Sequence, residues 1–210
     1  MTTNKTALAQ FYTPPHIGLR MSKLLQHNGE LLEPAAGDGA LLRAVKAVGN
    51  TSKVTAVEMD AEKAEGCVEY CDDLIVSDFF NIGLRVGHYD SIIMNPPYLK
   101  ASKIPQQTKD LPEFKRYEAM LSGHANLYAY FILKSYLLLK DGGELIVILP
   151  SEFTMATGCA KLNTLLHKNG TFTNLIKFKK SPFLPEVSPD VTIFRYVKGR
   201  SSHLTEVEII

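Results

Sequence analysis

The 210-residue sequence lacks the segments that mark membrane and secreted proteins. Its longest apolar stretch with helical character, residues 127–139, contains Lys134 and is too short to span a bilayer. Residues 1–10 are polar and lack the apolar core of a signal peptide. These absences predict a cytoplasmic protein that does not engage a membrane.

The sequence is also poor in cysteine and has no excess of charge. No histidine or second cysteine pair accompanies its three cysteines at metal-ligand spacing, so we expect free thiols and no metal. The 23 lysines and arginines nearly balance the 22 aspartates and glutamates, which argues against a generally basic nucleic-acid coat but permits a local basic patch. Repeats, low-complexity tracts and linkers are absent, and the length predicts one domain over residues 1–210.

What the sequence does contain is an alternation of short apolar runs with segments of helical periodicity. This pattern is typical of an α/β fold with a doubly wound, mainly parallel sheet. Seven strands are expected, over 30–33, 53–58, 73–77, 89–94, 144–149, 174–178 and 191–197. Helices are expected over 14–28, 61–70, 127–140 and 160–169, with another around 41–48. Residues 99–125 read as a long loop with at most one short helix, and 205–210 alternate like a strand.

A turn of small residues, 34–39, joins the first expected strand to the helix that follows it. Open parallel sheets bind their ligands at such strand-to-helix turns. Gly37 and Gly39 permit backbone angles that other residues resist, and small side chains let a ligand approach the backbone. Glu33 adds a carboxylate before the turn, which suits an amine-bearing ligand rather than a phosphate. The alternative is a tight turn that binds nothing.

Two further acidic residues follow neighbouring strands of the expected sheet. Glu58 closes the second strand, where an acidic side chain hydrogen-bonds the ribose of a nucleoside cofactor. Asp78 follows the third strand and can accept from an adenine amino group, while Phe79 covers the ring. Either residue alone would be ordinary surface. Together with the glycine turn they indicate a nucleoside site.

The element Asn95-Pro96-Pro97-Tyr98 ends the fourth expected strand and carries the strongest signal. Two prolines fix the backbone, so that carbonyl oxygens and the Asn95 amide present acceptors in a set geometry. Acceptors aimed at a conjugated amine localise its lone pair and make it nucleophilic, and Tyr98 could stack on the ring that bears it. A rigid loop without a ligand is the alternative.

The order of these motifs resembles the gamma class of adenine DNA methyltransferases. The resemblance rests on QFYTPP at 10–15, LEPAAGDGALL at 32–42, Glu58, the Asp-Phe pair at 78–79 and NPPY at 95–98, and it covers nearly the whole chain. Glutamine methyltransferases share NPPY, whereas the upstream Phe-Tyr-Thr-Pro favours the DNA enzymes. The resemblance implies a Rossmann-like methyltransferase fold, S-adenosylmethionine as cofactor, and transfer to the N6 amino group of a flipped adenine.

The resemblance also implies roles for individual residues. The cofactor would be held by Tyr12, Thr13, Glu33, Ala35, Gly37, Glu58, Asp78 and Phe79. The catalytic element would be Asn95, Pro96, Pro97 and Tyr98, with Phe183 as a second aromatic contact to the base or, equally, ordinary core. Lys100 and Lys103 follow the catalytic element and are candidates for DNA contacts, although loop lysines are often only solvated.

The chain departs from the family pattern because no separate target-recognition domain is evident. Three interpretations follow: an enzyme with little sequence preference, a subunit that borrows recognition from a partner, or part of a longer protein. RNA adenine and protein glutamine stay open as alternative substrates, as does a silent methyltransferase-like subunit of a restriction-modification system.

Overall fold

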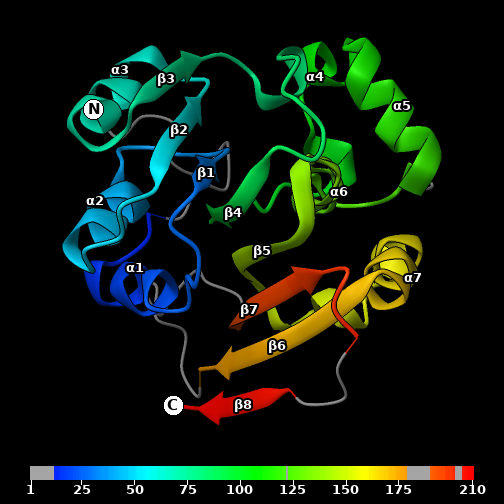
Figure 1. The fold of residues 1–210 in the computed structure, drawn as a ribbon. Coiled ribbons are helices and arrows are strands. Elements are labelled where there is room, and N and C mark those ends of the chain that lie inside the picture. The colour runs from blue at the N-terminus through cyan, green and yellow to red at the C-terminus, as the bar shows by residue number, and fades with distance from the viewer. Residues whose placement is uncertain (1–11, 122, 179–189, 202–204) are drawn as a thin grey trace.

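The computed structural model describes residues 12–121, 123–178, 190–201 and 205–210. One sheet, with strand order β3-β2-β1-β4-β5-β7-β6-β8, runs through the molecule (Figure 1). Its strands are β1 (Glu30–Glu33), β2 (Lys53–Glu58), β3 (Asp73–Val76), β4 (Tyr89–Met94), β5 (Leu139–Pro150), β6 (Gly170–Lys177), β7 (Val191–Lys198) and β8 (Glu206–Ile209). The α/β prediction is confirmed, but over the described ranges the sheet has eight strands rather than seven, because the alternating segment 205–210 adds β8 beside β6.

The sheet is parallel from β3 to β5 and then reverses. β7 runs antiparallel to both of its neighbours, and β8 is again parallel to β6. The chain reaches β1, β2 and β3 by stepping in one direction, then crosses back to place β4 on the other side of β1. This reversal between β1 and β4 is the position at which open α/β sheets bind ligands.

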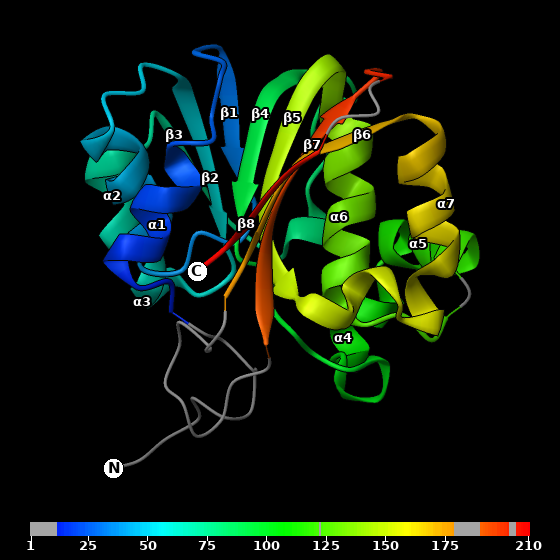
Figure 2. The ribbon, with the colours of Figure 1, turned by 90° about the horizontal axis from the view of Figure 1, so that it is seen from below.

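Helices cover both faces of the sheet. Figure 2 shows α1, α2 and α3 on one face and α4, α5, α6 and α7 on the other. The helices are α1 (Pro15–Ser22), α2 (Ala40–Ala47), α3 (Ala61–Ala64), α4 (Gln106–Asp110), α5 (Pro112–Leu121), α6 (Leu127–Leu138) and α7 (Ala160–Lys168). Single 3-10 turns include η1 (Glu65–Tyr70), η2 (Phe79–Asn81) and η3 (Ala101–Lys103). Within the described ranges no helix is long and apolar enough to cross a membrane.

The first helix ends earlier than predicted. A helix was expected over 14–28, but α1 stops at Ser22. The cause lies far away in the sequence, because the buried carboxylate of Glu144 accepts hydrogen bonds from the backbone N–H groups of Gln26 and His27 at 2.7 and 3.2 Å. These amides are thereby held by β5 instead of by a continuing helix.

The segment 99–125 also differs from its prediction. It contains η3 and two α-helices, α4 and α5, rather than a loop with one short helix. Helix α5 forms because Phe114, Tyr117 and Leu121 share one face and are buried against the core. Its other residues are mostly charged, so the sequence pattern does not reveal the apolar face. This segment packs beside the site described next.

Candidate active site

The turn between β1 and α2 brings small residues to the edge of the sheet. The backbone N–H of Ala36 donates to the Val57 carbonyl at 2.9 Å and fastens the turn to β2. Gly37 and Gly39 have φ angles of +56° and +81°, a region that side chains disfavour. A Cβ at Gly39 would stand 2.8 Å from the Gly66 carbonyl oxygen, so this close approach requires glycine.

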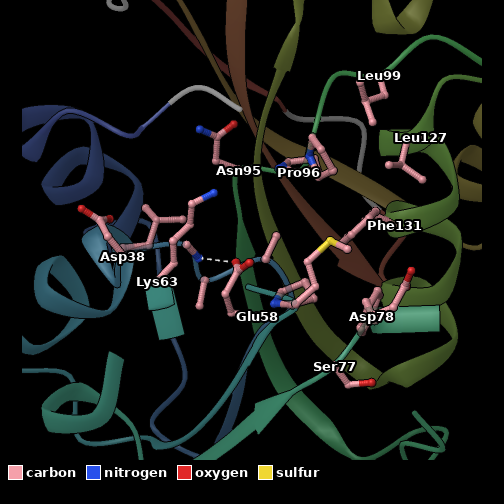
Figure 3. Close-up of a pocket in the computed structure, with 18 of the residues that line it drawn as sticks. Asp38, Glu58, Lys63, Ser77, Asp78, Asn95, Pro96, Leu99, Leu127 and Phe131 are labelled. Atoms are coloured by element: carbon pink, nitrogen blue, oxygen red, sulfur yellow. Dashed lines mark hydrogen bonds between the residues drawn. The ribbon is translucent and has the colours of Figure 1, made fainter. Parts of the chain in front are cut away.

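Glu58 is buried at the end of β2 and faces the same turn. One carboxylate oxygen accepts from the Gly37 backbone N–H at 2.7 Å, shown as the dashed line in Figure 3. The other accepts from the Asp60 backbone N–H at 3.0 Å. Two amides therefore fix the carboxylate in orientation, and each oxygen keeps a lone pair for a further donor.

Glu33, at the end of β1, is fully buried and lies outside the lining of the cavity that its neighbours form. Neither carboxylate oxygen has a hydrogen-bond partner within the described residues. Burial raises its pKa well above the usual value, and although the nearby Ala35 amide opposes this shift, the Glu58 charge adds to it. The expectation that Glu33 lines the pocket is not met, because its side chain is fully buried outside the lining.

Asp78 follows β3, directly before η2, and its carboxylate is held on both sides. Its carboxylate accepts from the Phe80 backbone N–H at 2.9 Å and from the Thr108 hydroxyl at 2.7 Å. The next residue, Phe79, is buried and stacks on Phe131 of α6 with ring centroids 5.1 Å apart. An acceptor and an aromatic surface thus lie side by side, as the sequence predicts.

Asn95 follows β4 on the opposite wall. Its amide nitrogen donates to the Thr13 hydroxyl at 3.1 Å, which joins the segment after β4 to the segment before α1. This bond orients the amide, with its carbonyl oxygen on the other side. Pro96 and Pro97 continue the wall, and Pro96 is buried.

These walls enclose one cavity at the carboxyl ends of β1 to β4 (Figure 3). Ten of the predicted site residues line it: Tyr12, Thr13, Ala35, Gly37, Glu58, Asp78, Phe79, Asn95, Pro96 and Pro97. Most of the lining is apolar, and its polar groups are a few carboxylates and hydroxyls, the Asn95 amide and the Lys63 ammonium, which is the usual make-up of a small-molecule site.

Tyr98 lies outside the cavity lining in this structure. Its hydroxyl donates to the Ile148 carbonyl of β5 at 3.0 Å, and its ring meets Tyr128 edge-on. Burial raises the pKa of the hydroxyl, so Tyr98 stays a neutral donor. Its stacking on a substrate base stays a prediction, with the ring held in place by β5.

The remaining predicted contact residues either fall outside the described residues or are exposed at the surface. Phe183 falls outside the described residues, as do the first residues of the QFYTPP motif. Lys100 and Lys103 are exposed on and next to η3, directly after the catalytic element.

The structure adds residues that sequence reasoning missed. Thr108 of α4 reaches Asp78, and Phe131 and Leu127 of α6 supply an apolar wall one helical turn apart. Met59 follows Glu58 and lines the same cavity. The spacing of Leu127 and Phe131 would have indicated one helix face, whereas nothing near Thr108 in the sequence points to Asp78.

Comparison with known proteins decides the family. A model described as the Eco57I restriction-modification methylase matches residues 46–183, well over half of the chain. The chain belongs to the Eco57I restriction-modification methylase family. This assignment agrees with the gamma-class resemblance of its motifs.

Relatives of this Eco57I-family chain include type II methyltransferases. M.HincII of Haemophilus influenzae is 33% identical over 95% of this chain, and M.AccI of Acinetobacter calcoaceticus is 32% identical over 82%. The chain spans 39% and 33% of the lengths of these two proteins. A Listeria monocytogenes structure classed as a class I S-adenosylmethionine-dependent methyltransferase aligns over all of this chain and 68% of its own, with a TM-score of 0.74 and 20% identity, which establishes the fold. Among the described residues of the Eco57I-family chain, no group of His, Cys, Asp and Glu is arranged to hold a metal.

Proposed function

We propose that this chain transfers a methyl group from S-adenosylmethionine to the N6 amino group of adenine in DNA. The observation that carries the proposal is the placement of Glu58, Asp78 and Asn95 around one cavity at the reversal of the sheet. Carboxylates on one side suit a nucleoside cofactor. An amide beside two prolines on the other side suits an amino group that must become nucleophilic.

The residues fit S-adenosylmethionine. Each oxygen of Glu58 accepts one hydrogen bond from a backbone amide and keeps a lone pair for a ribose hydroxyl. Asp78 can accept from an adenine amino group. Phe79 and Phe131 supply the aromatic surface for the adenine ring. A Cβ at Gly37 would meet no atom within 4 Å, which is consistent with space kept open for a ligand beside the backbone. When bound, the cofactor supplies a methyl group on a sulfonium, whose thioether is a good leaving group.

The hydrogen-bond acceptors of the catalytic element would make the target amino group nucleophilic through their position and charge. The Asn95 side-chain oxygen and the Pro96 carbonyl would accept from the two N6 hydrogens and draw the nitrogen lone pair out of the ring. Thr13 accepts from the Asn95 amide nitrogen, which leaves the side-chain oxygen on the other side of the amide for the target amino group. A base inside a duplex cannot reach this cavity, so the target adenine must rotate out, at a cost of a few kcal/mol. Stacking on Tyr98 would offset about 1–3 kcal/mol of that cost.

The test is methyl transfer from labelled S-adenosylmethionine to unmethylated duplex DNA, followed by nucleoside analysis. RNA and protein substrates are assayed in parallel. Labelled N6-methyladenine from the duplex is the expected result. Label in RNA or in a protein glutamine would move the proposal to those substrates, and cofactor binding without transfer would indicate a silent subunit.

Recognition of a target sequence is a separate part of the proposal. We propose DNA as the partner in the cytoplasm, and a specificity subunit or domain as the source of site selection. The sequence around each methylated adenine tests this. Methylation at one defined site by the chain alone would place recognition within these 210 residues. Methylation with little preference, which becomes selective when a partner is added, would support a separate recogniser.

A further inference from the structure

A second, basic hollow lies beside the active-site cavity. Lys100, Ser102, Lys109, His124 and Asn126 provide its polar lining, and we call this site the basic hollow. No acidic residue belongs to its lining in the part of the chain that the structure describes. Its charge therefore differs from that of the cavity, whose lining includes the carboxylates of Asp38, Glu58 and Asp78 and one lysine, Lys63.

The basic hollow and the cavity share a thin wall. The wall consists of the consecutive pairs 99–100, 108–109 and 126–127. In each pair one residue lines the cavity and its neighbour lines the basic hollow. The backbone N–H of Leu127 donates to the Leu99 carbonyl at 2.8 Å, which ties two of the pairs together. An ion in the basic hollow would thus be one residue away from the reaction site.

The lysines of the basic hollow are free to bind an anion. In the described part of the chain, neither Lys100 nor Lys109 makes an ion pair with an acidic side chain. The nearest acidic residue in sequence, Asp110, is already engaged by Gln106 at 3.1 Å and by Lys115 at 3.7 Å. Lys109 is also half-buried, so its position is more constrained than that of a surface lysine. Positive charge is therefore concentrated on a near-neutral protein at one defined place.

We propose that the basic hollow binds a backbone phosphate of the nucleic-acid strand whose base enters the cavity. The inference rests on the proposed function and deepens it. A base that leaves the duplex stays attached to its strand, so phosphates must lie close to the mouth of the cavity. Two ammonium groups together with the Ser102 hydroxyl and the Asn126 amide match the several oxygens of a phosphodiester. Phosphate contacts of this kind position the strand without reading its sequence.

The test compares the Lys100→Gln/Lys109→Gln variant with a matched control, Lys161→Gln/Lys168→Gln, which removes the same charge from exposed positions on α7. Binding of a short fluorescein-labelled duplex is measured by anisotropy over a range of salt concentrations, without cofactor. The hollow variant is expected to bind at least about tenfold more weakly, and the slope of log affinity against log salt should fall by about 1 per lost phosphate contact. The control should resemble the wild type, and cofactor affinity should be unchanged in both.

Equal losses in both variants, an unchanged slope in the hollow variant, or no duplex binding by the wild type would overturn the inference. Methyl transfer by the wild type, assayed alongside, separates the two proposals. If the wild type methylates DNA and the hollow variant binds DNA normally, the proposed function is supported and phosphate binding in the basic hollow is contradicted. If the hollow variant binds DNA more weakly but the wild type transfers no methyl group, phosphate binding is supported and the proposed function is contradicted.

Discussion

At the scale of single residues, Glu58 has the position from which a carboxylate can hold a ribose. Both of its oxygens are oriented by backbone amides, so little ordering is needed when a ligand binds. Glu58→Ala is expected to weaken S-adenosylmethionine roughly tenfold or more, because hydrogen bonds to charged groups contribute about 1.5–3 kcal/mol. Isothermal titration calorimetry measures this, with the exposed Glu62→Ala as control. An unchanged dissociation constant for Glu58→Ala would place the ribose elsewhere.

Glu33 differs at the same scale, because its carboxyl group is buried and has no hydrogen-bond partner among the described residues. Its pKa is raised in the folded protein, mainly by burial. The folded state therefore binds this proton more tightly than the unfolded state, and the stability so gained is lost as pH rises from about 4.5 through the folded pKa.

We expect Glu33→Gln to remove this dependence. The thermal midpoint of the variant should exceed that of the wild type at neutral pH, with the difference shrinking as the pH approaches 4.5. Thermal unfolding across this range, without cofactor, measures the effect, and Glu69→Gln controls for the loss of an exposed carboxylate. Parallel curves for Glu33→Gln and the wild type would mean that Glu33 is not the group responsible.

At the scale of elements, a buried ion pair joins the two halves of the sheet. Glu144 of β5 and Arg195 of β7 are both almost fully buried, with a closest contact of 2.7 Å. Glu144 also accepts from Ser91 of β4, and Arg195 donates to Thr173 of β6 and to Gln26 after α1. One network thus fixes the parallel strands, the antiparallel strands and the end of α1.

Breaking that pair from one side should be costly. Arg195→Met leaves the Glu144 charge buried without its partner, and we expect a loss of about 3–5 kcal/mol in the free energy of unfolding. Glu144→Gln/Arg195→Met should lose less, because no charge stays buried. Urea unfolding of both variants measures this. A loss below about 1 kcal/mol for Arg195→Met would show that the network is dispensable.

The elements that the sequence predicts correctly are those that depend on local patterns. The bounds of β1, β2 and β4 follow from local apolar runs and agree with the prediction, whereas the end of α1 depends on Glu144, more than a hundred residues away. Helix α5 was missed because its apolar face is surrounded by charged residues. Motifs at strand ends placed Glu58, Asp78 and Asn95 correctly around one edge. The enclosure of Glu33, the β5 contact of Tyr98 and the approach of Thr108 depend on packing that no local pattern carries.

At the scale of the whole molecule, the site is a consequence of topology. Strand order reverses between β1 and β4, so the turn after β1 and the Asn95-Pro96-Pro97 segment after β4 meet at one sheet edge. The pairs 99–100, 108–109 and 126–127 separate the cavity from the basic hollow. On this near-neutral chain the lysines of the hollow lie behind Leu99, Thr108 and Leu127, while the carboxylates of the cavity come from segments at or just after the strand ends.

The most direct test of this account is the single-turnover rate of N6-adenine methylation by Asn95→Ala, measured together with cofactor affinity. The account predicts that the rate on duplex DNA falls by about a hundredfold or more, since the Asn95 side-chain oxygen would act on the target amino group. The dissociation constant for S-adenosylmethionine should stay within about threefold of the wild type, a change of less than 1 kcal/mol. Wild-type turnover by Asn95→Ala would remove the Asn95-Pro96-Pro97-Tyr98 element from the chemistry and contradict the account.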